Sequence, residues 1–190
     1  GYAAYCFGDD TAKREGRLSF NPIKHIDPIM TIALPLFLAV MGGPIFGGAK
    51  PVPFNPHKVR YGEWGAALVA IAGPLTNLLI AFVVFGVGVL SGVITSAGVE
   101  ATLAGQIVIT AVSVNLGFFV FNILPIPPLD GSRVLYALAP DPVKAGMEYI
   151  ERYGIFLVFG LVLIGASVLG QIMAGGINGI LQLFMTIFRV

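Results

Sequence analysis

Four long runs of this 190-residue chain contain no Asp, Glu, Lys, Arg or His, and this absence constrains the fold more than any other feature of the sequence. The runs cover residues 28–49, 64–99, 101–129 and 153–188. A helix needs about 20 apolar residues to cross the hydrocarbon core of a bilayer, which is about 30 Å thick. Because each run is long enough, the sequence predicts an all-α, polytopic membrane protein embedded in the lipid bilayer.

The composition agrees with this fold class and excludes others. Charged residues make up 11% of the chain and the mean hydropathy is +0.88, whereas about one quarter of the residues in soluble domains are charged. These values exclude a disordered tail, a coiled coil and a basic nucleic-acid-binding protein, so no nucleic-acid partner is expected. The single cysteine, Cys6, excludes an internal disulfide and a zinc site built from cysteines. The length predicts one domain, or at most two small ones.

Transmembrane helices are predicted in three places, at about 66–90, 103–124 and 154–174. Gly73-Pro74 predicts a kink near the start of the first helix, and Gly175-Gly176 is expected to end the third. Residues 177–190 are apolar but short for another crossing. We expect them to extend a tilted helix or to lie at the membrane interface.

Basic residues gather in three connecting segments and are absent from residues 91–102. The basic segments are 9–27, 50–63 and 130–152. Cytoplasmic loops are enriched in Lys and Arg, so these segments are predicted to face the cytoplasm. A crossing at 28–49 would place 9–27 on the other side, and Pro35 and Gly42-Gly43-Pro44 break that run into pieces too short to span. We therefore expect a re-entrant or shallow hairpin at 28–49.

The segments 17–26 and 50–59 flank this hairpin, and each is a candidate short β-strand. Leu18 and Phe20 alternate with polar neighbours, as in a strand. The prolines in 50–59 force extended backbone and restrict that segment to a sheet edge, which could accept an extended peptide. The alternative is that both segments are ordinary extended loops.

Three asparagines lie inside the predicted spans, where polar groups are costly. We interpret Asn77 and Asn115 as residues that hydrogen-bond between helices. Asn122 differs because the stretch Leu124-Pro125-Ile126-Pro127-Pro128-Leu129-Asp130-Gly131 follows it and must end the helix. Asp130 then lies at the mouth of an apolar run, either as a metal ligand, proton carrier or ion ligand, or as a helix-capping residue.

The remaining motifs point to no chemistry by themselves. His25 and His57 lie in polar loops without a second histidine at helical spacing, and the chain contains no H-E-x-x-H. It also contains no GxSxG, P-loop or GxGxxG, so mechanisms based on a serine nucleophile or a bound nucleotide have no support.

Taken in order, the residues resemble the site-2 proteases, which are intramembrane zinc metalloproteases, and in particular their compact bacterial type. The matching pieces are Gly8-Asp9 with Thr11-Ala12-Lys13, Gly16-Arg17, Asn21-Pro22, His25-Ile26-Asp27-Pro28, Phe46-Gly47, Ala49-Lys50-Pro51-Val52-Pro53, Asn55-Pro56, Ala72-Gly73-Pro74 with Asn77, and Asn122 through Arg133. The resemblance extends from Gly1 to about Leu138. It implies a transmembrane protein as substrate, bound in an unwound form, and a bacterial cytoplasmic membrane as the location.

The resemblance also implies which residues bind zinc and which contact the substrate. Family members bind Zn²⁺ through H-E-x-x-H and a later aspartate, which is Asp130 in this sequence, while Asn122 would donate its amide to the substrate or the developing oxyanion. The family's H-E-x-x-H immediately precedes a pair like Gly1-Tyr2. We therefore expect residues 1–190 to be a single membrane-embedded protease core that lacks its N-terminal helices, two histidine ligands and the catalytic Glu, and that is inactive alone.

Two other functions fit the same sequence. Glycine-rich helices and the broken segments at 35–44 and 125–128 are also found in transporters and channels. A non-catalytic membrane scaffold derived from the same family is the third alternative.

Overall fold

The computed structural model describes the chain except for Phe20, residues 43–46, Pro51 and Ile164. Parts of the predicted strands and of the Gly42-Gly43-Pro44 break therefore fall outside the described residues. The chain forms two compact units, Gly1–Ala66 and Ala67–Val190, which we describe in turn.

The first unit consists of short helices and turns. Its elements are α1 (Tyr2–Cys6), α2 (Thr11–Arg14), the 3₁₀ turn η1 (Pro22–His25), the π-helical turn η2 (Pro28–Ala33), α3 (Leu34–Val40) and the 3₁₀ turn η3 (Pro56–Lys58). Two buried polar side chains hold these pieces together. The Arg17 guanidinium donates to the carbonyls of Lys24 and Lys50, and Asp9 is fully buried.

Asp9 joins the start of the first unit to its end. Its carboxylate accepts hydrogen bonds from the Thr11 N–H at 3.1 Å, the Thr11 hydroxyl at 2.5 Å and the Asn55 N–H at 2.8 Å. Burial by itself raises the pKa of Asp9, but these hydrogen bonds and the nearby Lys58 ammonium lower it. The pKa therefore lies below its ordinary value.

The described ends of the segment 28–49 lie side by side, as the predicted hairpin requires. The Gly48 N–H donates to the Met30 carbonyl at 2.9 Å, and the Thr31 hydroxyl donates to the Gly48 carbonyl at 2.7 Å. The chain therefore enters and leaves this segment at the same place. Pro35 does not interrupt the helix, because it lies in the first turn of α3, where its missing N–H costs no hydrogen bond. The helix ends at Val40, and Gly42 then adopts a positive φ of 69°.

The strands predicted at 17–26 and 50–59 are wrong. In the described part of the chain, the β-structure is one short antiparallel pair, β1 (Ile94–Thr95) and β2 (Gly98–Val99). Residues 22–25 turn instead because the Asn21 side chain accepts the Ile23 N–H at 3.0 Å and Pro22 follows it with a preset φ. A hydrogen bond from the Lys50 N–H to the His25 carbonyl joins the two segments without forming a ladder.

The second unit contains three helices long and apolar enough to cross a membrane, as expected for a polytopic membrane protein. They are α4 (Gly62–Leu90), which begins in the first unit, α5 (Leu103–Asn122) and α9 (Ala166–Phe188). Three shorter helices lie between α5 and α9, namely α6 (Gly131–Leu138), α7 (Asp141–Arg152) and α8 (Gly154–Leu163).

The first two spans are confirmed, but the third lies further along the chain than predicted. Helix α8 ends at Leu163, and the apolar span is Ser167–Phe188 instead of 154–174. Gly175-Gly176 does not end this helix, since both residues lie inside α9. The segment 177–190, predicted to be an extension or an interfacial piece, supplies the second half of the span.

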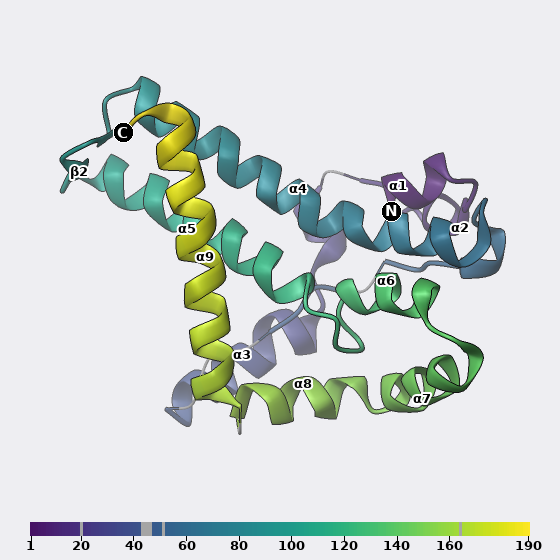
Figure 1. The fold of residues 1–190 in the computed structure, drawn as a ribbon. Coiled ribbons are helices and arrows are strands. Elements are labelled where there is room, and N and C mark those ends of the chain that lie inside the picture. The colour runs from purple at the N-terminus through teal and green to yellow at the C-terminus, as the bar shows by residue number, and fades with distance from the viewer. Residues whose placement is uncertain (20, 43–46, 51, 164) are drawn as a thin grey trace. The chain divides into compact units, whose positions relative to one another are not determined.

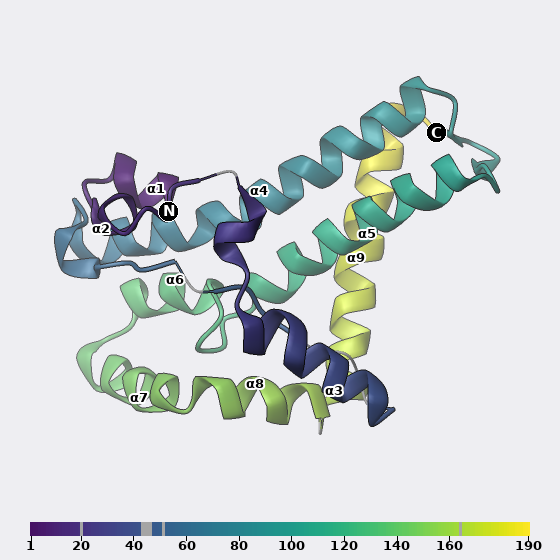
Figure 2. The same ribbon diagram turned by 180° about the vertical axis from the view of Figure 1, so that it is seen from behind.

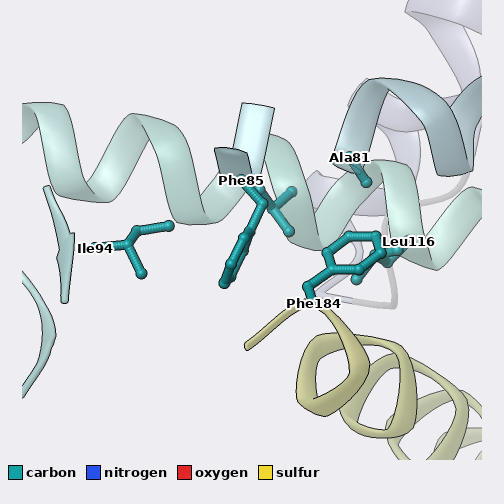
Figure 3. Close-up of a cluster of buried hydrophobic side chains, with 6 residues drawn as sticks. Ala81, Phe85, Ile94, Leu116 and Phe184 are labelled. Carbon is teal, nitrogen blue, oxygen red and sulfur yellow. The ribbon is translucent and has the colours of Figure 1, made fainter. Parts of the chain in front are cut away.

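A cluster of buried side chains joins the three long helices and strand β1 (Figure 3). Its members are Ala81, Phe85, Ile94, Val112, Leu116 and Phe184. The ring of Phe184 in α9 lies 5.2 Å from that of Phe82 and 5.6 Å from that of Phe85, both in the second half of α4. Such aromatic pairs add to the packing energy beyond the area that they bury.

The contacts of α9 also give its direction. Its C-terminal Phe188 packs near Gly86 of α4, and its middle residue Gly176 meets Val120 near the end of α5. Helix α9 therefore crosses both α4 and α5 steeply, with its C-terminal half against the second half of α4 (Figures 1 and 2). A Cβ at Gly88, near the end of α4, would lie 2.9 Å from Val108 near the start of α5, so the N-terminal end of α4 and the C-terminal end of α5 share the other side of the bundle.

The close approach of α5 and α9 gives a first prediction. A Cβ at Gly176 would lie 2.8 Å from Val120 Cγ1, whereas a Cβ at the adjacent Gly175 would meet nothing within 4 Å. We expect Gly176→Ala to lower the free energy of unfolding by about 1–3 kcal/mol relative to Gly175→Ala, because only the first change overpacks the helix contact. Thermal unfolding of both variants in the same detergent measures this difference. Equal stability would contradict the close contact.

Asp9 gives a second prediction. In Asp9→Asn, an amide N–H would face the buried Asn55 N–H, so we expect the variant to lose about 1–3 kcal/mol at pH 7. The carboxylate's contribution is complete above the ordinary pKa of 3.8 and is lost as the pH falls through the lower folded pKa. The difference between wild type and variant should therefore shrink below about pH 4.

Hydrogen exchange of peptides around Thr11 and Asn55, followed over pH, measures that difference. Asp10→Asn is the matched control, since the Asp10 carboxylate is more exposed and pairs with Arg14 and Lys58 at the surface. An equal effect of the two changes would rule out a special role for Asp9.

Candidate functional site

The candidate site lies where the chain passes from α5 to α6. Helix α5 ends at Asn122, and the proline-containing segment 123–130 leads to Gly131, the first residue of α6. Leu129 is buried, and its N–H donates to the Ile126 carbonyl at 2.9 Å. The prolines end the membrane helix as predicted. Asp130 lies on the side of the bundle where α5 ends and α4 begins.

The Asp130 side chain does not cap α6. Asp130 occupies the N-cap position, but its side chain accepts no capping hydrogen bond. Its Oδ2 atom instead lies against α4, 3.4 Å from the position that a Cβ would take at Gly73. The structure therefore excludes the helix-capping alternative and leaves the carboxylate available to a ligand.

Asp130 is partly buried, and among the described residues its carboxylate makes no hydrogen bond or ion pair. Burial raises the pKa of Asp130, and the nearby Arg133 offsets this only in part, so the pKa lies above its ordinary value. Arg133 is itself bound to Glu151. A partly desolvated carboxylate without a hydrogen-bond donor is costly in its charged form, which agrees with the direction of this shift.

Glycines allow the close contacts that hold the 123–130 segment in place. A side chain at Gly131 would collide with the Ile123 carbonyl, so α6 can begin directly against the end of α5. A Cβ at Gly154 would lie 2.8 Å from Pro128. The sequence gave no signal for Gly154, whose role depends on a contact between distant parts of the chain.

Asn122 and Asn115 make the same local hydrogen bond. The Nδ2 group of Asn122 donates to the Phe118 carbonyl at 2.9 Å, and that of Asn115 donates to the Ala111 carbonyl at 2.8 Å. The interhelical bond predicted for Asn115 is therefore replaced by a bond within α5. Since a primary amide has two N–H donors, Asn122 keeps one for another acceptor.

Residues on α5 nearer its start line a shallow hollow of about 430 Å³. Its lining comes from this one helix and consists of Leu103, Gln106, Ile107, Thr110, Ala111, Val114 and Asn115. None of these side chains titrates or binds metal strongly, so we place the chemistry at Asp130.

His25 has a hydrogen-bond partner within its own unit. His25 in the first unit donates through Nε2 to the Ser19 carbonyl at 2.9 Å, and the side chain of His57 lies outside the described part of the chain. Among the residues that the structure describes, no three His, Cys, Asp or Glu side chains form a group able to hold a metal. These residues do not complete a zinc site, and Asp130 supplies at most one ligand.

Fold and site together define a polytopic membrane protein with an unpartnered carboxylate at the end of a membrane-spanning helix. Comparison with known proteins shows which family this is. The chain is 42% identical over 192 residues to the Bacillus subtilis protein named "Putative zinc metalloprotease YwhC", and the match covers 99% of this chain and 84% of YwhC. The chain belongs to this zinc metalloprotease family.

More distant relatives carry similar names. "Putative zinc metalloprotease Rip2" of Mycolicibacterium smegmatis is 28% identical over 167 residues, which are 85% of this chain and 60% of Rip2. "Putative zinc metalloprotease MJ0611" of Methanocaldococcus jannaschii is 40% identical over 67 residues, 35% of this chain and 31% of MJ0611. No protein-family model and no solved structure matches the chain.

Proposed function

We propose that this chain is the membrane core of an intramembrane zinc metalloprotease of the site-2 type, which cleaves transmembrane segments of other membrane proteins. The observation that carries the proposal is the Asp130 carboxylate, partly buried, without a hydrogen bond and held against Gly73 at the end of a membrane helix. Family membership supports the metalloprotease part, and the apolar helices support a site within the membrane.

Asp130 would supply one oxygen ligand to Zn²⁺, whose role when bound is to act as a Lewis acid. In the resemblance on which the proposal rests, the family's H-E-x-x-H motif supplies the other two ligands and the catalytic glutamate. The residues of this chain would position the substrate. Asn122 would use its second amide N–H to donate to a carbonyl oxygen of the unwound substrate, while the first N–H remains bonded to Phe118.

The proposed location is the bacterial cytoplasmic membrane, with segments 9–27, 50–63 and 130–152 on the cytoplasmic side. The approach of Val108 to Gly88 and of Asp130 to Gly73 supports an arrangement in which the N-terminal end of α4 and the C-terminal end of α5 share that side. The catalytic centre would then lie near the cytoplasmic face of the membrane.

The role of Asp130 is tested by zinc content. In the complete gene product, Asp130→Ala is expected to lower zinc affinity by more than the 10–100-fold that the loss of an outer-shell partner costs. Competition with a chelator, followed by metal analysis, measures this affinity. Asp141→Ala is the control, because the Asp141 side chain is almost fully exposed on α7. Undiminished zinc binding in Asp130→Ala would remove Asp130 from the metal site.

The role of Asn122 is tested against Asn115, which makes the same bond within α5. Asn122→Ala is expected to lower kcat about 10²–10³-fold, as the loss of an oxyanion donor does in other hydrolases, and to keep its zinc. Asn115→Ala should lose the same helix hydrogen bond and retain activity. Cleavage of a purified transmembrane substrate in detergent or liposomes measures both rates. Equal rates in the two variants would assign Asn122 a structural role only.

A further inference from the structure

Helix α7 is amphipathic, and its apolar side faces outward. Val143, Tyr149, Ile150 and Tyr153 are exposed by 48%, 62%, 41% and 53%. These residues recur at the spacing of one helical face. The face also contains Gly146 and no charged residue. A surface helix of a soluble protein shows the reverse orientation, with its charged side toward the solvent.

The charged side of α7 contacts α6. Glu151 pairs with Arg133, and the Tyr136 hydroxyl donates to Glu148 Oε1 at 2.5 Å. The Lys144 ammonium lies 5.5 Å from the centre of the Tyr136 ring. Helix α6 also has a polar face and an apolar face. Arg133 and Tyr136 contact α7, while Leu135 and Leu138 are exposed. The two helices thus turn their polar faces toward each other and their apolar faces outward.

We propose that α6 and α7 lie in the membrane–water interface, with the apolar face of α7 buried among the lipid headgroups and upper acyl chains. Only Tyr153 separates α7 from the wholly apolar helix α8, and α5, which is long and apolar enough to cross a membrane, is separated from α6 by residues 123–130. The pair is therefore joined to a candidate span on one side and to an apolar helix on the other, which favours a position at the bilayer surface.

The side chains of the exposed face match this environment. Tyr149 and Tyr153 form a ring pair with centroids 5.5 Å apart, at the end of α7 that joins α8. Tyrosine is enriched at membrane interfaces, where its ring lies among apolar groups and its hydroxyl meets water. The absence of charge on this face gives no complementarity to a protein partner, whereas an amphipathic helix buries such a face in the interface through its apolar area.

The inference rests on the packing of α6 and α7 and does not depend on protease activity. It gives the pair a positioning role, because Asp130 directly precedes α6. A pair anchored at the interface would fix the depth of Asp130 relative to the bilayer.

Spin-label accessibility tests the proposal in the full chain, reconstituted in phosphatidylcholine–phosphatidylglycerol nanodiscs. In a Cys6→Ser background, Ile150→Cys reports on the apolar face and Asp141→Cys on the opposite, exposed side of the same helix. Val143→Cys repeats the measurement on the apolar face if the label at 150 impairs folding. We expect the ratio of collisions with O₂, which partitions into lipid, to those with a water-soluble nickel chelate to be several-fold higher at 150 and 143 than at 141.

Equal ratios at the two faces would overturn the proposal, since both faces would then lie in the same environment, water or lipid. Protection of positions 150 and 143 from both collision reagents would overturn it as well, because it would show a protein or a second copy of the chain covering the face. Neither outcome would bear on zinc binding by Asp130, which is measured separately.

Discussion

A membrane offers no water to the backbone, so every N–H and C=O group at membrane depth needs a partner within the protein. The three long helices meet this requirement internally. The segment 123–130 meets it differently, since three of its residues are prolines without an N–H, and it lies at the end of α5 beside the first half of α4. The chain can therefore leave the helix there and place a carboxylate at the edge of the apolar region.

Small residues fix where that carboxylate lies. Asp130 can approach α4 because Gly73 has no side chain, and α6 can start against α5 because Gly131 has none. In a membrane the hydrophobic effect does not press helices together, so close packing at small residues supplies much of their association. The same device acts at Gly176, where α9 meets α5. The arrangement of the second unit thus depends on close contacts at glycines as well as on the buried cluster around Phe85 and Phe184.

The sequence predicted the elements with strong local signals. Helix α5 begins where Thr102 accepts the Gly105 N–H at 3.1 Å and ends before the prolines, and both signals are visible in the sequence. The third span was misplaced because the charge-free run 153–188 holds both α8 and α9, and Gly176 is a packing residue that resembles a helix end. The strand predicted at 17–26 did not form. The Asn21 side chain accepts a local N–H and a proline follows it, and together they favour a turn over a strand that only a weak alternation of apolar and polar residues suggested.

In the candidate site, too, some features have local sequence signals and others depend on contacts between distant residues. Asp130 and Asn122 were singled out because helix-breaking prolines lie beside polar residues in an apolar run. The placement of the Asp130 side chain against α4 could not be predicted, because Gly73 lies 57 residues earlier in the chain. The polar contacts between α6 and α7 were equally invisible, since Arg133 and Glu151 pair only after the two helices fold back on each other. That pairing directs the apolar side of α7 outward and ties the helix that begins after Asp130 to the bilayer surface. The depth of the carboxylate is thus set by a contact with lipid as well as by the contact with Gly73.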